Sequence, residues 1–112
     1  MRTMSPAAEI VVVYSTVPTG ESARISRELL DRRLVACVSI VPVRSMYRWR
    51  GAVCNDGEDL LIMKTRKSRV PELIPAIREI HPYEVPEIVV LPVTAGSPPY
   101  LDWVRTETRD GA

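Results

Sequence analysis

The sequence contains no phenylalanine, one histidine and two cysteines. The single histidine, His81, leaves one subunit without the several imidazoles that tight transition-metal sites usually contain. Cys37 and Cys54 belong to no CxxC or Cys/His repeat, so neither a disulfide framework nor a structural zinc site is expected. Both are predicted to be free thiols in a reducing, cytoplasmic compartment. Without phenylalanine, the chain also lacks the aromatic strand signature of an RNA-recognition module.

An excess of one charge and long hydrophobic runs are missing as well. Fifteen Lys and Arg residues face fourteen Asp and Glu residues, giving a net charge of +1, so no nucleic-acid or membrane partner is expected. The apolar runs fall short of the roughly 20 residues that a membrane helix needs. With 46% hydrophobic and 26% charged residues, the 112-residue chain is typical of one globular domain. We expect that domain at 9–105, between a flexible N-terminus (1–8), which resembles no signal peptide, and a polar tail (106–112).

Hydrophobic spacing divides the chain into alternating strands and helices. The run from Glu9 to Thr16 is apolar and β-branched, which indicates a central strand covered on both faces. Ile25 and Leu29 recur at helical spacing among charged residues. Strands are expected at 9–16, 35–49, 59–65 and 86–94, and helices at 21–34, 68–80 and 100–104. With right-handed crossovers, this order predicts an α+β fold: a ferredoxin-like βαββαβ antiparallel sheet with two helices on one face, plus a short C-terminal helix.

Proline and glycine add local expectations. Pro42 has no N–H group, so its strand must bend, bulge or lie at a sheet edge there. Pro75 is expected to give its helix a late or distorted first turn. Gly51 and the segment Asn55–Gly57 are turn signals, so residues 43–65 are predicted to form a long hairpin arm. Such an arm exposes apolar side chains and unpaired backbone groups unless another chain covers them.

Several segments carry, in order, the pattern of a known family. They are LVACVSIVP (34–42), SMYRW (45–49), KTR (64–66), HPYEVPE (81–87), LPV (91–93) and YLDW (100–103). Together they cover most of the chain, and it resembles the CutA-type divalent-cation tolerance proteins. The resemblance implies a homotrimer built by pairing of sheet edges, a PII-like architecture, a link to tolerance of copper and other divalent ions, and no established enzyme reaction.

The resemblance also implies candidate metal ligands. They include the histidine and the later glutamate of the HPYEVPE segment, here His81 and Glu87, and Glu84 joins them if subunit contacts bring it close. Ser15 stands where some family members have a cysteine, which removes the softest ligand. The expected cofactor is therefore a weakly bound Cu2+ or another divalent cation, with no organic cofactor. In the alternative interpretation, His81 caps a helix or bonds a backbone group.

The remaining candidates are ligand-binding or interface residues. Aromatic and cationic side chains on the arm and near the C-terminus could form a ligand cage or anchor neighbouring subunits. Lys64 precedes the second helix, whose N-terminus could hold an anion. No catalytic nucleophile and base are found, so the chain is not expected to be an enzyme. The competing function is a stable trimeric scaffold or PII-like signalling protein that offers a surface to protein partners. The ligand or interface set is Tyr47, Arg48, Trp49, Lys64, Tyr83 and Trp103.

Overall fold

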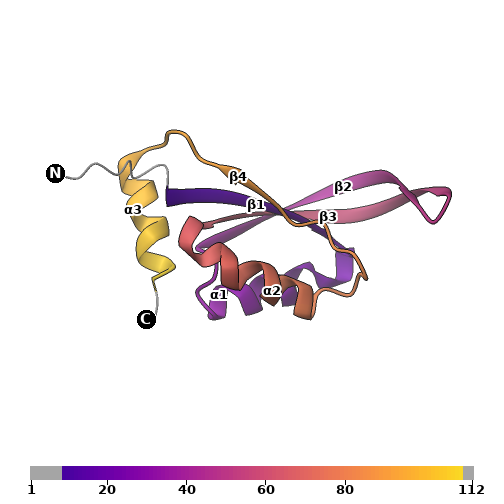
Figure 1. Cartoon of the computed structure of the whole chain (residues 1–112), viewed down its shortest axis with the longest axis horizontal. Coiled ribbons are helices and arrows are strands. Elements are labelled where there is room, and N and C mark those ends of the chain that lie inside the picture. Colours follow the sequence, from indigo (N-terminus) through magenta and orange to yellow (C-terminus); the bar gives the residue numbers. More distant parts are fainter. Residues whose placement is uncertain (1–8, 110–112) are drawn as a thin grey trace.

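Four strands form one antiparallel sheet in the structure, a computed structural model that describes residues 9–109. They are β1 (Ile10–Val17), β2 (Cys37–Trp49), β3 (Ala52–Arg66) and β4 (Val89–Pro92), which lie in the order β2-β3-β1-β4. Helices α1 (Ser22–Asp31) and α2 (Val70–Ile80) cover one face of the sheet, and α3 (Pro98–Glu107) stands at one end (Figure 1). This arrangement confirms the predicted ferredoxin-like α+β fold.

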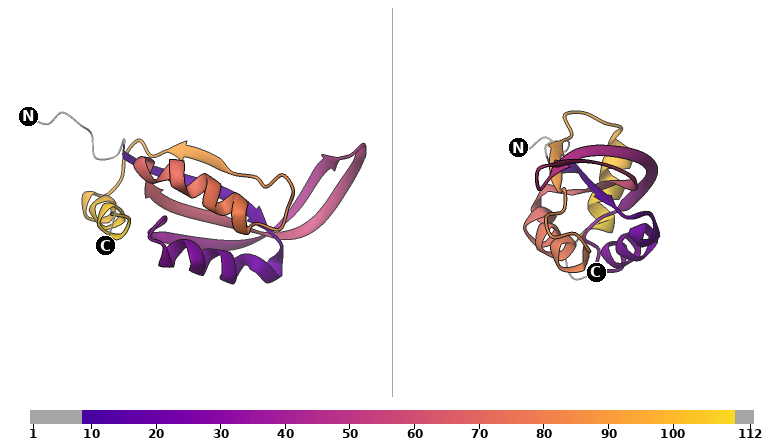
Figure 2. Two further views of the ribbon diagram at one scale, coloured as in Figure 1. Left: turned by 60° about the horizontal axis from the view of Figure 1, so that its bottom comes forward. Right: turned by 90° about the vertical axis from the view of Figure 1, so that its right-hand side faces the viewer.

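The sheet and the two helices form two layers (Figure 2), and the buried side chains of the main core come from both. Side chains alternate between the two faces of a strand, so every second residue of β1 faces the helices and is buried. β1 is the central strand that its sequence predicted, but in one subunit it is covered on the helix side only, and Val12 and Tyr14 on the other face are half-buried. The fully buried core includes Val13, Val17, Ile25, Leu29, Leu61, Met63, Leu73 and Ile77.

The predicted arm is present, and of its two turn signals the one at Gly51 forms the turn and the one at Asn55–Gly57 does not. Arg50 and Gly51 both have positive φ, at 53° and 81°, and form a two-residue loop between β2 and β3. This loop fixes the register, and Asn55–Gly57 therefore lies inside β3, where its residues pair with 44–46 of β2. The expectation of a turn at Asn55–Gly57 and of a strand starting at residue 59 was wrong, because the Arg50–Gly51 loop already supplies the reversal.

Two element boundaries also differ from the sequence prediction. α1 ends at Asp31 rather than residue 34, because Arg33 adopts a left-handed conformation (φ 56°) and the Leu34 N–H bonds back to the Leu29 carbonyl. α2 begins at Val70 rather than at residue 68, after a short 3-10 turn (Lys67–Arg69), so its first turn is late as expected, and the helix then continues through Pro75. Pro42 follows expectation, because β2 is an edge strand.

α3 forms a second, smaller core at the end of the sheet. Leu101 and Val104 pack with Ile10 and Ala36. The helix is longer than predicted and includes two residues of the expected polar tail. α3 and the arm lie at opposite ends of a molecule 54 Å long (Figure 1).

In the part of the chain that the structure describes, no helix is long and apolar enough to cross a membrane. Residues 1–8 and 110–112, which belong to the predicted termini, lie outside the described part.

Candidate ligand groove at the base of the arm

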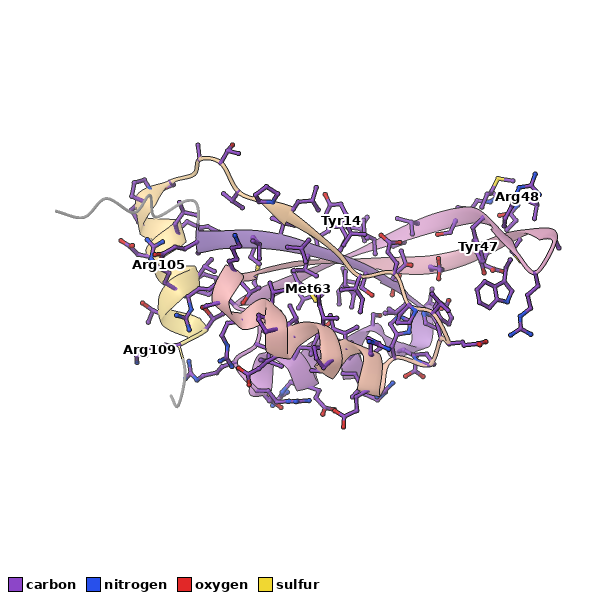
Figure 3. The ribbon with its side chains drawn as sticks, in the orientation of Figure 1. Tyr14, Tyr47, Arg48, Met63, Arg105 and Arg109 are labelled. Atoms are coloured by element: carbon purple, nitrogen blue, oxygen red, sulfur yellow. The ribbon has the colours of Figure 1, made fainter. Side chains whose placement is uncertain are left out.

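A groove of about 760 Å³ opens where the arm leaves the sheet. We call it the arm groove. One wall is the arm, through residues 44–47, Trp49 and Glu58, and the other is the segment 82–87 that follows α2. Thr16, at the end of β1, also lines it. Figure 3 shows Tyr47 on the arm, far from Arg105 on α3. The groove thus joins side chains from segments that are distant in sequence.

His81 holds the 82–87 segment against β1. Its ring is buried, and Nε2 lies 2.8 Å from the Thr16 carbonyl oxygen. The Tyr83 N–H donates to Nδ1 at 3.1 Å. Because Nδ1 accepts this bond, the ring proton belongs on Nε2, where it is donated to the carbonyl. His81 therefore bonds backbone groups through both ring nitrogens, as in the alternative interpretation above, and a metal ion at either nitrogen would replace one of these bonds.

Two tyrosine–carboxylate pairs lie at the groove, each with its carboxylate on β3. The Tyr83 hydroxyl donates to Glu58 Oε2 and the Tyr47 hydroxyl to Asp56 Oδ2, each at 2.6 Å. The hydrogen bond to Asp56 raises the pKa of Tyr47 to about 12. Partial burial, followed by the bond to Glu58, raises the pKa of Tyr83. Both tyrosines therefore stay neutral donors over the physiological pH range and tie the two walls to β3.

Glu58 is the most buried carboxylate of the groove, with only 4% of the residue exposed. Within residues 9–109, no cationic side chain forms an ion pair with it. Sequence reasoning missed Glu58 because it placed a turn immediately before it. A loop at Arg50–Gly51 gives the signal that could have found it, since Asp56 and Glu58 then lie two residues apart on one strand.

The other two predicted metal ligands line the same groove but make separate contacts. Glu84 forms an ion pair with Arg50 at 2.8 Å, and Glu87 Oε1 accepts a bond from the Thr16 hydroxyl at 3.4 Å. Ser15 precedes Thr16 on β1, so its buried side chain leaves the opposite face of the strand. Over residues 9–109, no three His, Cys, Asp or Glu side chains gather closely enough to hold a metal ion. The metal-ligand set therefore stays a prediction.

The predicted ligand or interface residues divide into two groups. Tyr47, Trp49 and Tyr83 line the arm groove, and the Arg50 guanidinium lies 5.3 Å from the Trp49 ring centre. Arg48 is exposed on the arm outside the groove lining. The other two lie outside the groove as well. Lys64 Nζ is 3.4 Å from Ser39 Oγ on the sheet, and Trp103 stacks near Tyr100 on α3, with ring centres 5.6 Å apart.

Comparisons with known proteins agree with this fold. The family described as CutA1 divalent ion tolerance protein matches residues 11–107. A divalent-cation tolerance protein CutA of Thermus thermophilus is 50% identical over 87% of this chain and 96% of its own length. The chloroplastic protein CutA of Arabidopsis thaliana is 41% identical over 98% of this chain, which spans 62% of that protein.

Solved structures give the same result. CutA1 from Oryza sativa superimposes with a TM-score of 0.89 at 39% identity, covering 96% of this chain and all of that one. A PII-like protein CutA from Nostoc, solved in apo form, gives 0.85 at 39% identity, covering 88% of this chain and 97% of that one. The chain therefore belongs to the CutA1 family of divalent ion tolerance proteins.

Proposed function

We propose that the chain forms a homotrimer that contributes to divalent-ion tolerance and binds a metal ion or small ligand in clefts where subunits meet. The observation that carries this proposal is the exposure of apolar side chains on both edge strands of one subunit. Strand β2 exposes Ile40 and Val41 at 44% and 39%, and strand β4 exposes Val89 and Leu91 at 45% and 39%. Both strands are sheet edges. An edge strand with unpaired backbone groups and exposed apolar side chains tends to pair with another chain.

Identical copies can supply that cover. If the β2 edge of one subunit meets the β4 edge of the next, the contact is head-to-tail, and it forms a ring when the rotation from one copy to the next closes. The half-buried helix-free face of β1 would then lie toward the inside of the assembly. Membership in the family, through the resemblance described above, sets the expected number of subunits at three. The segment 82–87, which forms one wall of the arm groove, leads directly into β4. A neighbour at the β4 edge would therefore complete the outer rim of the groove.

The metal part of the proposal rests on carboxylates and one imidazole. His81, Glu84 and Glu87 belong to one seven-residue stretch, and each contacts β1 or the arm. A second copy could add the missing donors and complete a mixed nitrogen and oxygen site for Cu2+ or another divalent cation. With Ser15 in place of a thiol, such a site would hold copper weakly.

Copper titration of matched variants tests this part. His81→Ala removes the only imidazole, and Glu87→Gln removes a groove carboxylate without touching the bonds of His81. Glu79→Gln, on the outer face of α2, changes the net charge equally and serves as the control. We expect the first two variants to lose most copper binding and the control to keep it. Unchanged binding in both groove variants would remove these residues from the site.

A signalling or scaffold role is the second candidate. Met46 and Val53 on the arm are 68% and 60% exposed, more than most apolar residues of the described chain, and aromatic Trp49 on the same arm is 39% exposed. Such residues are typical anchors of protein interfaces. Binding of nucleotides or capture of a protein partner by the assembled protein, without stoichiometric copper binding, would favour this role. Cys37 and Cys54 are unpaired thiols, in keeping with a cytoplasmic or other reducing compartment.

A further inference from the structure

The walls of the arm groove are aromatic on both sides. Tyr47 and Trp49 come from β2, and Tyr83 comes from the segment opposite. Each is 36–40% exposed, so its ring is open to a ligand rather than packed in the core. A cation is attracted to the face of such rings, and Trp49 already has the Arg50 guanidinium 5.3 Å from its centre. These walls therefore suit a ligand that carries positive charge on a hydrocarbon frame.

The charge of the lining has the matching sign. Glu58, Glu84 and Glu87 are acidic, whereas Arg44 is the only basic residue of the lining within the described chain. The Arg44 side chain is engaged along the arm, where Nε donates to Asn55 Oδ1 at 3.1 Å. The net charge of the lining is thus negative, which raises the local concentration of cations.

Glu58 gives the groove a specific position for that charge. Its carboxylate is withdrawn from water, accepts one bond from the Tyr83 hydroxyl and has no ion pair within residues 9–109. An ionised carboxylate in such a place is costly unless a cation or further donors reach it. An ammonium group supplies both at once, because it carries the charge and three N–H donors. The bond from Tyr83 goes to Oε2, so Oε1 of this lining residue is the oxygen assigned to the ligand in the proposal below.

A metal ion in this groove would bind the carboxylates and leave the aromatic walls without a role, because aromatic rings and the Met46 thioether are poor ligands for hard divalent cations. The cavity, about 760 Å³ in volume, is in the range of small-molecule pockets. We infer that the arm groove binds a small organic ammonium ion, with its charged end on Glu58 and its hydrocarbon part between Trp49 and Tyr83. This inference rests on the proposed ligand-binding function and names the ligand class.

The same chemistry has two possible sources. One is a free alkylamine from solution. The other is a cationic side chain of a second copy, for which Arg48 is the best candidate, since it is exposed on the arm and makes no ion pair with the other described residues. In the proposed assembly, contacts between copies involve the arm, so a neighbour's Arg48 is the cationic side chain proposed to enter this groove.

Calorimetric titration of the assembled protein with 1,4-diaminobutane tests the inference, and 1,4-butanediol, a neutral molecule of similar shape, is the matched control. We expect the diamine to bind and the diol not to bind. Glu58→Gln keeps the shape of the side chain and should weaken diamine binding at least about tenfold. Glu79→Gln, outside the groove, should leave it unchanged. Tryptophan fluorescence in a Trp103→Phe background, where Trp49 is the tryptophan that remains, provides a second signal, and circular dichroism checks that each variant is folded.

Arg48→Ala separates the two sources. Tighter diamine binding in this variant than in the wild type would identify the neighbour's guanidinium as the natural occupant, and equal binding would indicate a free amine. Failure of the diamine to bind either protein, or equal binding of diamine and diol, would overturn the inference. Copper titration of the same samples keeps the two proposals apart, because copper binding without amine binding would contradict this inference alone.

Discussion

Two buried serines should respond in opposite directions to the same substitution. Ser15 on β1 is fully buried, and its hydroxyl has no hydrogen-bond partner within the described chain. Ser22 at the start of α1 is also buried, but its hydroxyl lies 2.6 Å from Asp59 Oδ2 and 3.2 Å from the Thr19 carbonyl oxygen. We predict that Ser15→Ala stabilises the protein and that Ser22→Ala destabilises it.

The magnitudes follow from the cost of leaving polar groups without partners. Ser15→Ala removes a hydroxyl that loses its water on folding and gains nothing in return, so we expect a gain of about 1 kcal/mol. Ser22→Ala leaves the buried Asp59 carboxylate without its closest donor, which should cost about 1.5–3 kcal/mol. At about 4 °C per kcal/mol for a domain of this size, the two melting temperatures should differ by roughly 10–16 °C.

Guanidinium chloride unfolding, followed by circular dichroism, measures both effects. All samples must have the same protein concentration, because association of subunits adds to the apparent stability. The wild type should unfold between the two variants. A Ser15→Ala variant that unfolds at lower denaturant than the wild type would refute the reasoning, since it would show that the Ser15 hydroxyl forms a stabilising bond.

Three further predictions concern other bonds and the core. In an ultraviolet pH titration, Tyr47 should ionise near pH 12, and Asp56→Asn should return its ionisation toward pH 10, the ordinary value. Because the folded-state pKa is raised, the stability that this pair contributes is present below pH 10 and is lost as the pH rises through about 12; an unshifted titration would exclude the bond. Thr65→Val should cost about 1–3 kcal/mol in chemical unfolding, since it leaves the Leu34 carbonyl without the hydroxyl 2.7 Å away, and a neutral effect would contradict this. Ile77→Ala should cost about 2–5 kcal/mol in the same assay, and a smaller loss would show that α2 relaxes into the cavity.

The sequence predicted the fold well where periodicity is unambiguous. The spacing of Ile25 and Leu29 and the apolar run of β1 identify core elements, because both patterns report which face is buried. Turn chemistry was less reliable. Asn55–Gly57 is a strong local turn signal, yet the Arg50–Gly51 loop reverses the chain first, and pairing of the complete β2 and β3 strands outweighs the local preference.

The candidate site was predicted only in part. Tyr47, Trp49 and Tyr83 were identified from their residue types, and the structure places all of them in one groove. Glu58 was missed, because its role depends on a strand register and on a tyrosine 25 positions away. A backbone bond of His81 was among the alternatives, but its partner Thr16 could not be predicted, since the contact joins the end of α2 to the end of β1. Spacing within one segment cannot reveal such long-range partners.

The central claim is that the arm and the sheet edges of one copy are completed by identical copies. Sedimentation velocity over a dilution series, with circular dichroism of the same samples, tests it most directly. We predict a folded species of about 38 kDa, three times the 12.6 kDa subunit, that persists on dilution. A stably folded species with the mass of one subunit would contradict the account.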